Sequence, residues 1–286
     1  MIGTRGALAM VDIYKWLFGA RGKAAMDDLA EDASGLLSPY LEDIARTELP
    51  IIAIEVGSDA PQRPEASSLG GLAWWPASRP YPRDAKGHPL HLLVQLNFAD
   101  MPSLEPFPSK GLLQIFIAAD DLYGCNFEDP ARQEGFCCVY HAEIDQAPLS
   151  ARDNPVLKSE PLGYLPLENP SMPLALRFSL GRMAVDCTDY RFEKLLPEIA
   201  ADDALRDAYC DFVQAPALRL GGYPTFTQED PRAYNDAGRY GDFTLLTVDT
   251  TDGIMWGDSG VAQFFMHEAD LRRGDFSRVA YNWDCC

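Results

Sequence analysis

Among all segments of this chain, Gly257–Gly260, which reads Gly-Asp-Ser-Gly, comes closest to a catalytic motif. A serine in such a segment attacks an acyl carbon when a histidine takes its proton and a buried carboxylate orients that histidine. In the catalytic motif a second glycine follows the segment, whereas this chain has Val261 there. None of the four histidines, at positions 88, 91, 141 and 267, lies in a sequence context typical of the catalytic histidine. We therefore predict a turn that enters a strand, a dispensable Ser259 and no catalytic residue.

Histidine and cysteine pairs are the possible starting points for a metal site. His88 and His91 are three residues apart, and Cys137–Cys138 and Cys285–Cys286 are adjacent pairs, the second of them beside Asp284. Zinc ligands are spaced by roughly two to four residues so that their side chains converge. Adjacent residues of a strand point to opposite faces, so each cysteine pair offers one ligand to a given site. We predict no metal and no cofactor, and free thiols instead.

The cysteine count and the N-terminal composition predict a reducing compartment. Seven cysteines are an odd number, and their spacing does not resemble a secreted disulfide framework. Arg5, Lys15 and Arg21 interrupt the short apolar stretches near the N-terminus, which leaves no signal-peptide core. No run reaches the roughly 18 apolar residues that span a bilayer. We therefore expect a cytoplasmic protein with reduced cysteines.

One strand face is the best candidate for a ligand surface. Alternation along residues 90–98 gives an apolar side, from Leu90 to Phe98, and a second side that carries His91, Gln95 and Asn97. Aromatic walls with a few convergent polar groups are typical of small-molecule sites, and three tryptophans lie close in sequence to these strands. The candidate ligand-binding residues are therefore Trp74, Trp75, His91, Gln95, Asn97, Asp249, Trp256 and Asp258.

The same residues also fit a sheet face whose polar groups bond to one another, with the tryptophans in the core. Gly70–Gly71 and Gly221–Gly222 do not form phosphate loops, because neither pair lies in a GxxxxGK[ST] or GxGxxG pattern. We expect both glycine pairs to provide unusual backbone angles or a close approach of two chain segments at equivalent corners.

The charge of the chain narrows the choice of partners. Its 286 residues include 43 acidic and 24 basic side chains, which give a net charge of -19. Such a surface repels nucleic acid and anionic membranes, and the chain has no basic stripe that would release counterions from DNA. We expect a basic protein or a small molecule as the partner, no nucleic acid and no membrane. The oligomeric state stays open.

The chain carries one series of landmarks twice, about 150 residues apart. Each series has a glycine pair, a strand-like run with a polar centre, a glutamine-containing strand and an Asp-Leu step. The first is Gly70–Gly71, Gln95, GLLQIF (Gly111–Phe116) and Asp121–Leu122; the second is Gly221–Gly222, Thr247, GVAQFF (Gly260–Phe265) and Asp270–Leu271. The pattern predicts an internal duplication of two β-rich units, approximately 70–140 and 217–283, with pseudo-twofold symmetry.

Helical segments accompany these units. Apolar residues recur at helical spacing over residues 8–48, and Ile51–Val56 reads as a strand. Leu174–Met183 alternates as a further strand, and residues 186–213 read as an acidic helical insert in which Asp202 is a candidate N-cap. No flexible linker separates these parts. We predict one compact domain over residues 1–286, of α+β class and predominantly β.

Gln114 and Gln263 stand within apolar rows of their strands, at the same place in both series. A buried amide without a hydrogen bond costs about 1–3 kcal/mol. We therefore expect both amides to be buried and hydrogen-bonded at the interface between the units, where they serve the architecture.

Several stretches resemble the YwqG-like family of bacterial proteins. RLGGYPTFTQEDPR (219–232) and the segment around WGDSG (256–260) look like its C-terminal half, while GGLAWWP, HPLHLLVQLNF and FPSKGLLQIFI resemble its N-terminal half. The resemblance covers roughly residues 50–286. It implies a mostly β protein of α+β type with internal duplication, and it implies no activity, because the family is a domain of unknown function. Thr247 departs from the family pattern, in which the second copy often carries glutamine.

The functional prediction rests on the lack of a complete acid–base, nucleophile, metal or phosphate-binding arrangement in the sequence. We predict a non-catalytic cytosolic binding or interaction protein, of which an immunity-like acidic partner of a basic toxin is one concrete version. The alternative is an enzyme or small-ligand sensor that uses a cleft between the two β-rich units, with Trp74, His91 and Asp249 among its lining residues.

Overall fold

A curled antiparallel sheet is the framework of the protein. The computed structural model describes residues 35–159, 163–234 and 237–286. The strands in this part of the chain are β1 (Leu49–Val56), β2 (Ser68–Leu69), β3 (His91–Asn97), β4 (Leu112–Ile117), β5 (Phe136–His141), β6 (Leu174–Met183), β7 (Leu218–Gly221), β8 (Phe243–Asp249), β9 (Val261–Met266) and β10 (Ala280–Asp284). They form one sheet in the order β10-β9-β8-β7-β1-β6-β2-β3-β4-β5, and all neighbours in it are antiparallel.

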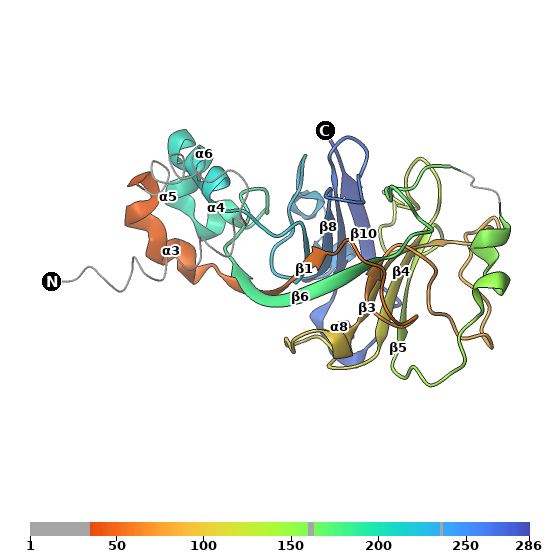
Figure 1. Ribbon diagram of the computed structural model, residues 1–286. Coiled ribbons are helices and arrows are strands. Elements are labelled where there is room, and N and C mark those ends of the chain that lie inside the picture. Colours follow the sequence, from red (N-terminus) through yellow and green to blue (C-terminus); the bar gives the residue numbers. More distant parts are fainter. Residues whose placement is uncertain (1–34, 160–162, 235–236) are drawn as a thin grey trace.

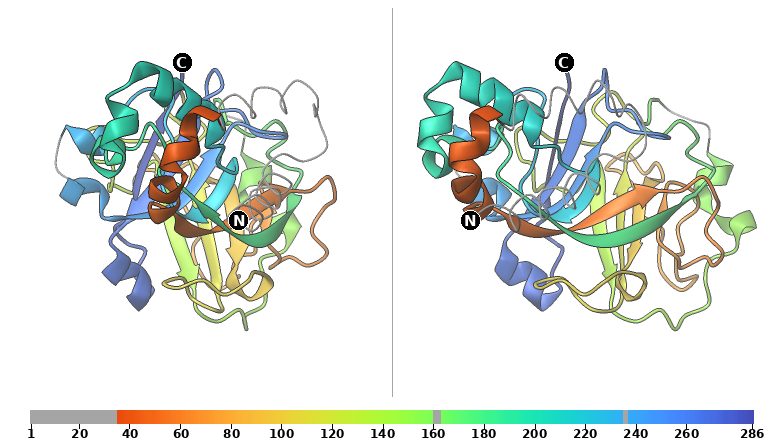
Figure 2. Two further views of the ribbon diagram at one scale, coloured as in Figure 1. Left: turned by 90° about the vertical axis from the view of Figure 1, so that its left-hand side faces the viewer. Right: turned by 60° about the vertical axis from the view of Figure 1, so that its left-hand side comes forward.

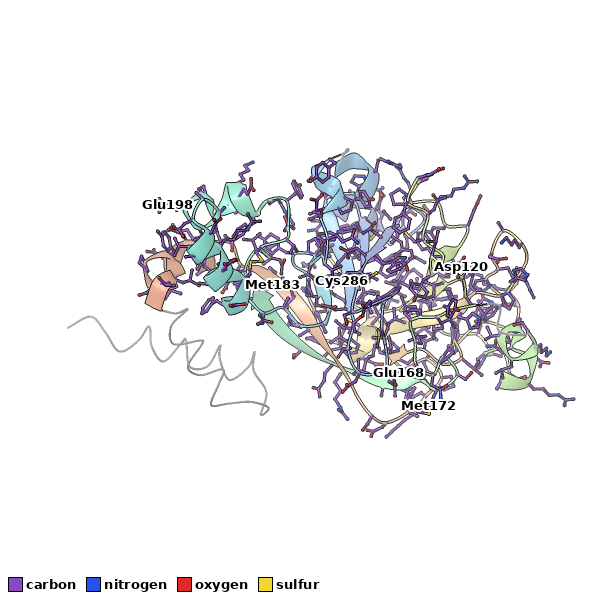
Figure 3. All side chains as sticks on the ribbon, turned by 90° about the horizontal axis from the view of Figure 1, so that it is seen from above. Asp120, Glu168, Met172, Met183, Glu198 and Cys286 are labelled. Atoms are coloured by element: carbon purple, nitrogen blue, oxygen red, sulfur yellow. A yellow bond between two sulfur atoms is a disulfide. The ribbon has the colours of Figure 1, made fainter. Side chains whose placement is uncertain are left out.

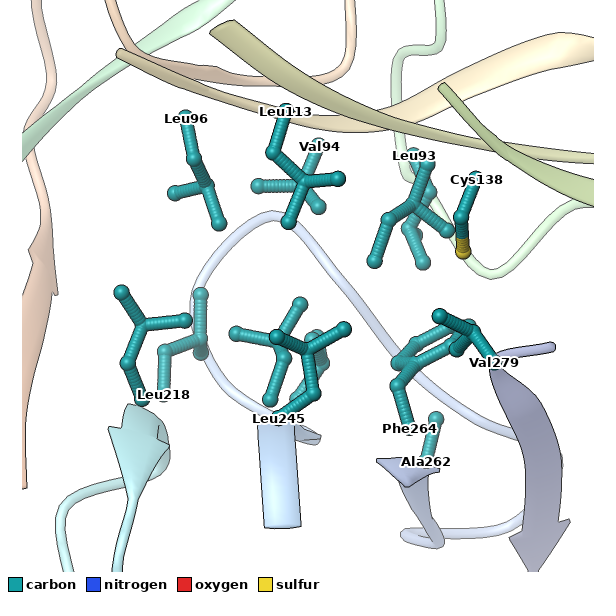
Figure 4. Close-up of a cluster of buried hydrophobic side chains, with 14 of the residues drawn as sticks. Leu93, Val94, Leu96, Leu113, Cys138, Leu218, Leu245, Ala262, Phe264 and Val279 are labelled. Carbon is teal, nitrogen blue, oxygen red and sulfur yellow. The ribbon is translucent and has the colours of Figure 1, made fainter. Parts of the chain in front are cut away.

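The sheet bends so that two arms, β2–β5 and β7–β10, face each other across an apolar core (Figure 1). Alternate residues of β4 and β9 point into this core, because successive side chains of a strand lie on opposite faces. In Figure 4, Leu96 and Leu113 of the first arm lie opposite Leu218, Leu245 and Phe264 of the second. Removal of this apolar surface from water is the main interaction that holds the arms together.

The two edge strands, β5 and β10, are joined by the connection between β4 and β5. The Tyr281 N–H of β10 donates to the Pro130 carbonyl at 2.8 Å. Gln133 accepts a hydrogen bond from the Cys138 N–H of β5 at 2.8 Å and donates to the Phe276 carbonyl at 3.0 Å. Part of each edge is thereby hydrogen-bonded within the chain, which removes sites where another chain would add a strand.

Most of the helices gather at one end of the sheet (Figure 1). They are α3 (Leu41–Arg46), α4 (Phe192–Leu195), α5 (Pro197–Ala200) and α6 (Asp203–Phe212), which we call the helical cap; α7 (Ala237–Tyr240) and α8 (Glu268–Arg273) lie in connections of the second arm. Short 3-10 helices span Ser38–Tyr40, Phe98–Asp100, Ala151–Asp153, Pro155–Lys158 and Pro231–Ala233. Both views of Figure 2 place α3 beside α4–α6.

The helical cap has its own apolar core. Ile44 of α3, Phe192 of α4 and Tyr209 of α6 share this cluster with Ile51 of β1, so the cap packs on one end of the sheet. The Tyr209 hydroxyl also donates to the Val185 carbonyl at 2.7 Å. Helices as short as α4 and α5 are not stable by themselves, and this packing is what keeps them folded.

Several elements agree with the predictions from the sequence. β6 covers the predicted strand Leu174–Met183, β1 contains the predicted strand Ile51–Val56, and the insert at 186–213 contains α4–α6. Asp202 is the N-cap of α6, since its carboxylate accepts the Leu205 N–H at 3.0 Å.

Residues 8–34 of the predicted helical region lie outside the described residues. In the rest of it, residues 35–37, the 3-10 helix Ser38–Tyr40 and α3 are helical. No helix in the described ranges is long and apolar enough to cross a membrane.

The glycine pairs form tight corners, as predicted. Gly71 has a φ of 84° and Gly222 a φ of 71°, a region of backbone conformation that favours glycine. A Cβ on Gly71 would lie 2.5 Å from Pro173, and a Cβ on Gly222 would lie 2.5 Å from Ile51. Each corner therefore lets the chain pass close to a central strand, because Ile51 lies in β1 and Pro173 directly precedes β6.

The regular alternation predicted for residues 90–98 is wrong. The register of β3 against β4 shifts between Leu92 and Val94, as in a β-bulge. Leu90 and Leu92 consequently pack on the outer face of the arm, the face that also carries Gln95, whereas Val94 belongs to the core between the arms.

Gln114 and Gln263 are both buried and hydrogen-bonded, as predicted, and each is 0% exposed. Gln114 Nε2 donates to the Trp74 carbonyl at 2.5 Å, and Gln263 Nε2 donates to the Thr225 carbonyl at 2.5 Å. The expected position at an interface between the units is wrong. Both side chains alternate with core residues and so point to the outer faces of their arms.

Replacement of Gln263 with leucine should lower the free energy of unfolding. Leucine has a similar volume, but it leaves the Thr225 carbonyl and the Thr247 hydroxyl, now 2.6 Å from Gln263 Oε1, without partners. A buried group left unpaired costs about 1–3 kcal/mol. Gln146→Leu is the control, because Gln146 is exposed and should change stability by less than about 0.5 kcal/mol. Urea unfolding that gives equal midpoints for the two variants would contradict this account.

Candidate functional site

A polar network lies on the outer face of the first arm. Gln95 Oε1 accepts the Trp74 N–H at 3.0 Å and Gln114 Nε2 at 2.7 Å. Gln95 Nε2 donates to two backbone carbonyls, at 2.8 and 2.7 Å. Gln114 Oε1 lies 3.0 Å from His141 Nε2, which must be the protonated ring nitrogen because its partner is a carbonyl oxygen. All four side-chain amide hydrogens of Gln95 and Gln114 are used within the network, so these two side chains stabilise the fold.

His141 is held in an aromatic setting. The rings of Trp74 and Trp75 meet it edge-on, with centroids 5.2 and 5.4 Å away. Burial lowers the pKa of His141 to about 4, and the charge of Arg79 adds to this effect. The imidazole is therefore neutral at neutral pH.

A buried arginine organises the outer face of the second arm. Arg219 donates to the Pro216 carbonyl at 2.8 Å and to the Tyr223 carbonyl at 2.8 Å. Burial lowers the pKa of Arg219 to about 10, and burial raises the pKa of Asp249 and of Asp186, whose charges interact with it. The guanidinium thus fixes the chain on both sides of β7.

The residues proposed from the sequence do not line one cleft. Four of these residues lie at the outer face of the first arm, and all four are buried: Trp74, Trp75, Gln95 and Asn97. Trp256 is buried in the second arm, Asp249 is half-buried there and Asp258 is exposed. A hydrogen bond joins the Trp74 N–H to Gln95. Apolar side chains fill the space between the arms, which is where the sequence predicted a shared cleft.

The Gly-Asp-Ser-Gly segment is a turn that enters β9, as predicted. Ser259 is exposed with a φ of 59°, and the Gly260 N–H donates to the Trp256 carbonyl at 2.7 Å. Among the hydrogen bonds of the described residues, none joins Ser259 to a histidine, and a serine nucleophile needs such a base.

His91 lines a different place, an open polar cleft on the first arm with a cavity of about 230 Å³. Asp84 Oδ2 lies 2.9 Å from His88 Nδ1, and Asp84 Oδ1 accepts the N–H groups of Lys86 and His88 at 2.9 and 2.7 Å. Burial raises the pKa of Asp84, but the hydrogen bonds from His88 and Lys86 outweigh it, so the pKa falls below its ordinary value. The polar lining residues are Asp84, Lys86, His88, His91, Asp120 and Ser159.

This cleft can take part in hydrogen bonding and proton transfer. Because the Asp84 carboxylate holds Nδ1–H of His88, its Nε2 is the nitrogen with the free lone pair. Burial lowers the pKa of His91, which is neutral at neutral pH. In the described ranges, no group of three or more His, Cys, Asp or Glu residues is arranged to hold a metal ion.

The sequence did carry a signal for the Asp84–His88 pair. An aspartate that precedes a glycine turn often bonds backbone N–H groups ahead of it, and Gly87 has a φ of 87°. Such a turn brings residues four positions apart into contact, so the sequence offered Asp84 and His88 as a candidate hydrogen-bonded pair. The three-residue spacing of His88 and His91 did not suggest this pair.

The helical cap presents a row of carboxylates. Asp203, Asp207 and Asp211 recur every four residues on α6, so they lie in line on one side of it, while Tyr209 is buried on the other. The exposed acidic residues of the cap segment 192–211 are Glu193, Glu198, Asp202, Asp203, Asp207 and Asp211. Within the described residues none of these six forms an ion pair. Glu198 of the cap and Asp120 of the cleft lie far apart, on opposite sides of the molecule (Figure 3).

Cys187 and Cys210 form a disulfide, with their Cα atoms 5.8 Å apart. The prediction that all cysteines are reduced thiols is therefore wrong for this pair. The two residues are 23 positions apart, and only the fold of the insert brings them together. The free cysteines are Cys125, Cys137, Cys138, Cys285 and Cys286.

Comparison with known proteins identifies the family. Residues 67–285 match the family model described as a domain of unknown function (DUF1963), and the chain belongs to this family. No curated protein matches the chain. The family match supports the predicted domain of unknown function, while the YwqG-like assignment stays a prediction.

Acid should destabilise the protein through His141. The folded pKa lies near 4 and the unfolded pKa near 6.5, so the unfolded chain binds more protons between these values. The contribution of neutral His141 to the free energy of unfolding is therefore fully present above about pH 6.5. It falls as the pH drops toward 4, by at most about 1.4 kcal/mol per pH unit. His141→Gln should flatten this part of the stability profile in urea unfolding. An unchanged slope between pH 6.5 and 4 in the variant would assign the effect to another group.

Proposed function

We propose that this member of the DUF1963 family is a non-catalytic binding protein that docks a basic partner on its helical cap. The observation that carries the proposal is the row of exposed carboxylates at Asp203, Asp207 and Asp211, which have no ion pair within the described chain. An acidic immunity-like partner of a basic toxin is one concrete form of such a protein.

Only part of the row stabilises the helix: Asp203 lies in the first turn of α6, where a negative charge interacts favourably with the helix dipole. Like charges four residues apart destabilise a helix by roughly 0.2–0.5 kcal/mol per pair. Asp211 also lies in the last turn of α6, where a negative charge opposes the helix dipole. A basic partner would turn these repulsions into attractions, and its approach would be accelerated by the net charge of -19.

Removal of the row should weaken the binding of a basic peptide. The variant Asp203→Asn/Asp207→Asn/Asp211→Asn loses three exposed charge contacts of roughly 0.5 kcal/mol each, which together correspond to about a tenfold loss of affinity. Fluorescence anisotropy of a labelled ten-residue arginine peptide at low salt measures this loss.

The matched control is Asp121→Asn/Asp129→Asn/Asp145→Asn, which removes three exposed carboxylates of the first arm. Both variants lose three negative charges, so both change the net charge from -19 to -16. The control should bind within about twofold of the unaltered protein. Equal losses in the two variants would mean that total charge alone attracts the peptide, and the proposed docking surface would be rejected.

A small polar ligand in the cleft of the first arm is a second candidate function. The Asp84–His88 hydrogen bond favours it, because a carboxylate that orients an imidazole is common where the other ring nitrogen meets a ligand. His88 Nε2 would accept a hydrogen bond from the ligand, and the cavity of about 230 Å³ limits the ligand to a small molecule.

NMR of the histidine rings tests this second function. His88 should be the Nδ1–H tautomer at pH 8, and Asp84→Asn should abolish that preference because the acceptor for Nδ1–H is weakened. Millimolar propanol, acetate and acetamide, added one at a time, should shift the signals of His88 and His91 together for at least one of them. His267 is the control, since its Nδ1 lies 3.7 Å from Asp242 outside the cleft. Shifts in none of the three titrations, or equal shifts of His267, would exclude the cleft as a site for these classes.

We also propose that the two arms derive from a duplicated unit whose first strands are exchanged. β1 precedes the first arm in the sequence but pairs with β7 of the second, and β6 precedes the second arm but pairs with β2 of the first. The close contacts support this: Gly71 lies against Pro173 and Gly222 against Ile51, which are the starts of the exchanged strands.

The hydrogen bonds support the same origin. Gln114 and Gln263 donate to carbonyls that each come three residues after a glycine pair, those of Trp74 and Thr225. Both glutamines are paired across the ladder with the polar centre of the preceding strand, Gln95 in one case and Thr247 in the other. The register of β8 against β9 also shifts just before Thr247, as that of β3 does before Gln95.

A further inference from the structure

A pocket of about 310 Å³ opens at the margin of the core between the arms, where β1 ends and β6 begins. Its lining comes from four parts of the chain: the end of β1, strand β2, the connection that leads into β6, and the turn between β8 and β9. Two of its lining residues, Glu168 and Met172, lie close together in Figure 3, far from Glu198 of the helical cap.

The buried part of the lining is apolar. Leu69 and Leu167 belong to the core cluster between the arms and are 1% and 7% exposed. Val56 and Leu174 are half-buried and pack against the same cluster. A Cβ on Gly253 would lie 2.7 Å from Leu174 Cδ1, so a larger residue at this position would intrude on the lining. The pocket therefore offers an apolar surface on which a short hydrocarbon chain can be buried.

The walls of the pocket are joined by hydrogen bonds of the backbone. Thr251 and Ile254 exchange two N–H···O bonds of 3.0 Å, so that Asp252–Gly253 is the tip of a tight turn. The Glu168 N–H donates to the Gly253 carbonyl at 3.0 Å, which fixes this tip against the connection that leads into β6. The pocket is thus formed before a ligand enters, and binding does not have to order its walls.

The ionisable side chains of the lining are both carboxylates. Glu168 and Asp252 are exposed at the rim, and within the described residues neither carboxylate has a hydrogen bond or an ion pair. Arg177 lies nearby on β6, but its guanidinium is engaged by Asp59 at 3.4 Å and by Glu55 at 4.0 Å. The rim therefore keeps its negative charge, and a cation that sits there meets it from two segments of the chain.

We propose that this pocket binds a small alkylammonium ion, that is, a protonated primary amine on an unbranched hydrocarbon chain. The chain lies on the apolar lining around Leu69 and Leu174, and the ammonium group stays at the rim beside Glu168 and Asp252. An ammonium group has three hydrogens to donate, enough for both carboxylates and a water molecule. The proposal is independent of the docking surface on α6, because it concerns another site and another class of ligand.

Titration of the full-length protein with hexylammonium chloride at low salt tests the site. The methyl NMR signals of Leu69 and Leu174 should shift and saturate, while those of Leu205 in the helical cap should stay in place. Hexanol, which lacks the charge, should bind about fivefold more weakly, and hexanoate more weakly still. Methylammonium, which lacks the chain, should bind about tenfold more weakly or less tightly than that.

The variant Glu168→Gln/Asp252→Asn removes both rim charges and leaves the apolar lining intact. It should bind hexylammonium about fivefold more weakly and hexanol as before, so that the preference for the cation disappears. The matched control is Asp121→Asn/Asp129→Asn, which removes two exposed carboxylates of the first arm. Both variants change the net charge from -19 to -17, and the control should keep the preference. Equal urea midpoints of the two variants check that both are folded.

Four outcomes would overturn the proposal: no saturable shift with hexylammonium, equal affinity for hexanol and hexylammonium in the unaltered protein, equal losses in the two variants, or a loss of hexylammonium binding in Asp203→Asn/Asp207→Asn/Asp211→Asn. The last of these would place the cation on α6 instead. Nα-acetyl-lysine methylamide carries the same ammonium chain on a peptide backbone. If it binds more tightly than hexylammonium, the ligand is a lysine side chain of a protein, and the free amine is rejected.

Discussion

The ladder between β1 and β6 is the interaction on which the rest of the sheet depends. Antiparallel pairing runs along both strands, from Leu49 opposite Met183 to Val56 opposite Leu176. β7 attaches to the free edge of β1, and β2 attaches to the free edge of β6. The ladder therefore holds each arm at its root, and the curl of the sheet brings the arms together over their shared core. Without it, the apolar sides of both arms would face water.

Local patterns predicted the elements of this sheet well. Leu174–Met183 alternates without interruption, and β6 has those bounds. The glycine pairs stood out because only glycine fits a positive φ beside a packed strand, as at Gly71 and Gly222. The bulge at Leu92 was not predictable in this way, because residues 90–98 read as a regular strand in either register. The pairing of Cys187 with Cys210 depends on how α4–α6 fold back, which no spacing rule describes.

The candidate site was harder to predict than the fold. The two-residue repeat of a strand places Gln95 and Asn97 on one face, but it does not show whether solvent or another part of the chain covers that face. The segment that contains Trp74 covers it and takes up the amide groups of Gln95 and Gln114. A polar group in a strand is therefore weak evidence for a ligand site until its partners are known. The carboxylates of α6 differ in this respect, because their exposure follows from a helical period with Tyr209 on the opposite side.

The architectural polar groups and the proposed docking surface thus occupy different parts of the molecule. In the sheet, buried amides and the Arg219 guanidinium are bonded to the backbone, and such groups stabilise a single arrangement. In the cap, the acidic row destabilises α6 by a few tenths of a kcal/mol per neighbouring pair. A disulfide that closes a loop between residues 23 positions apart contributes about 3 kcal/mol in the chain-entropy view. This contribution exceeds the repulsion, and together with the packing of Tyr209 in the cap cluster it allows the cap to keep a surface of like charges.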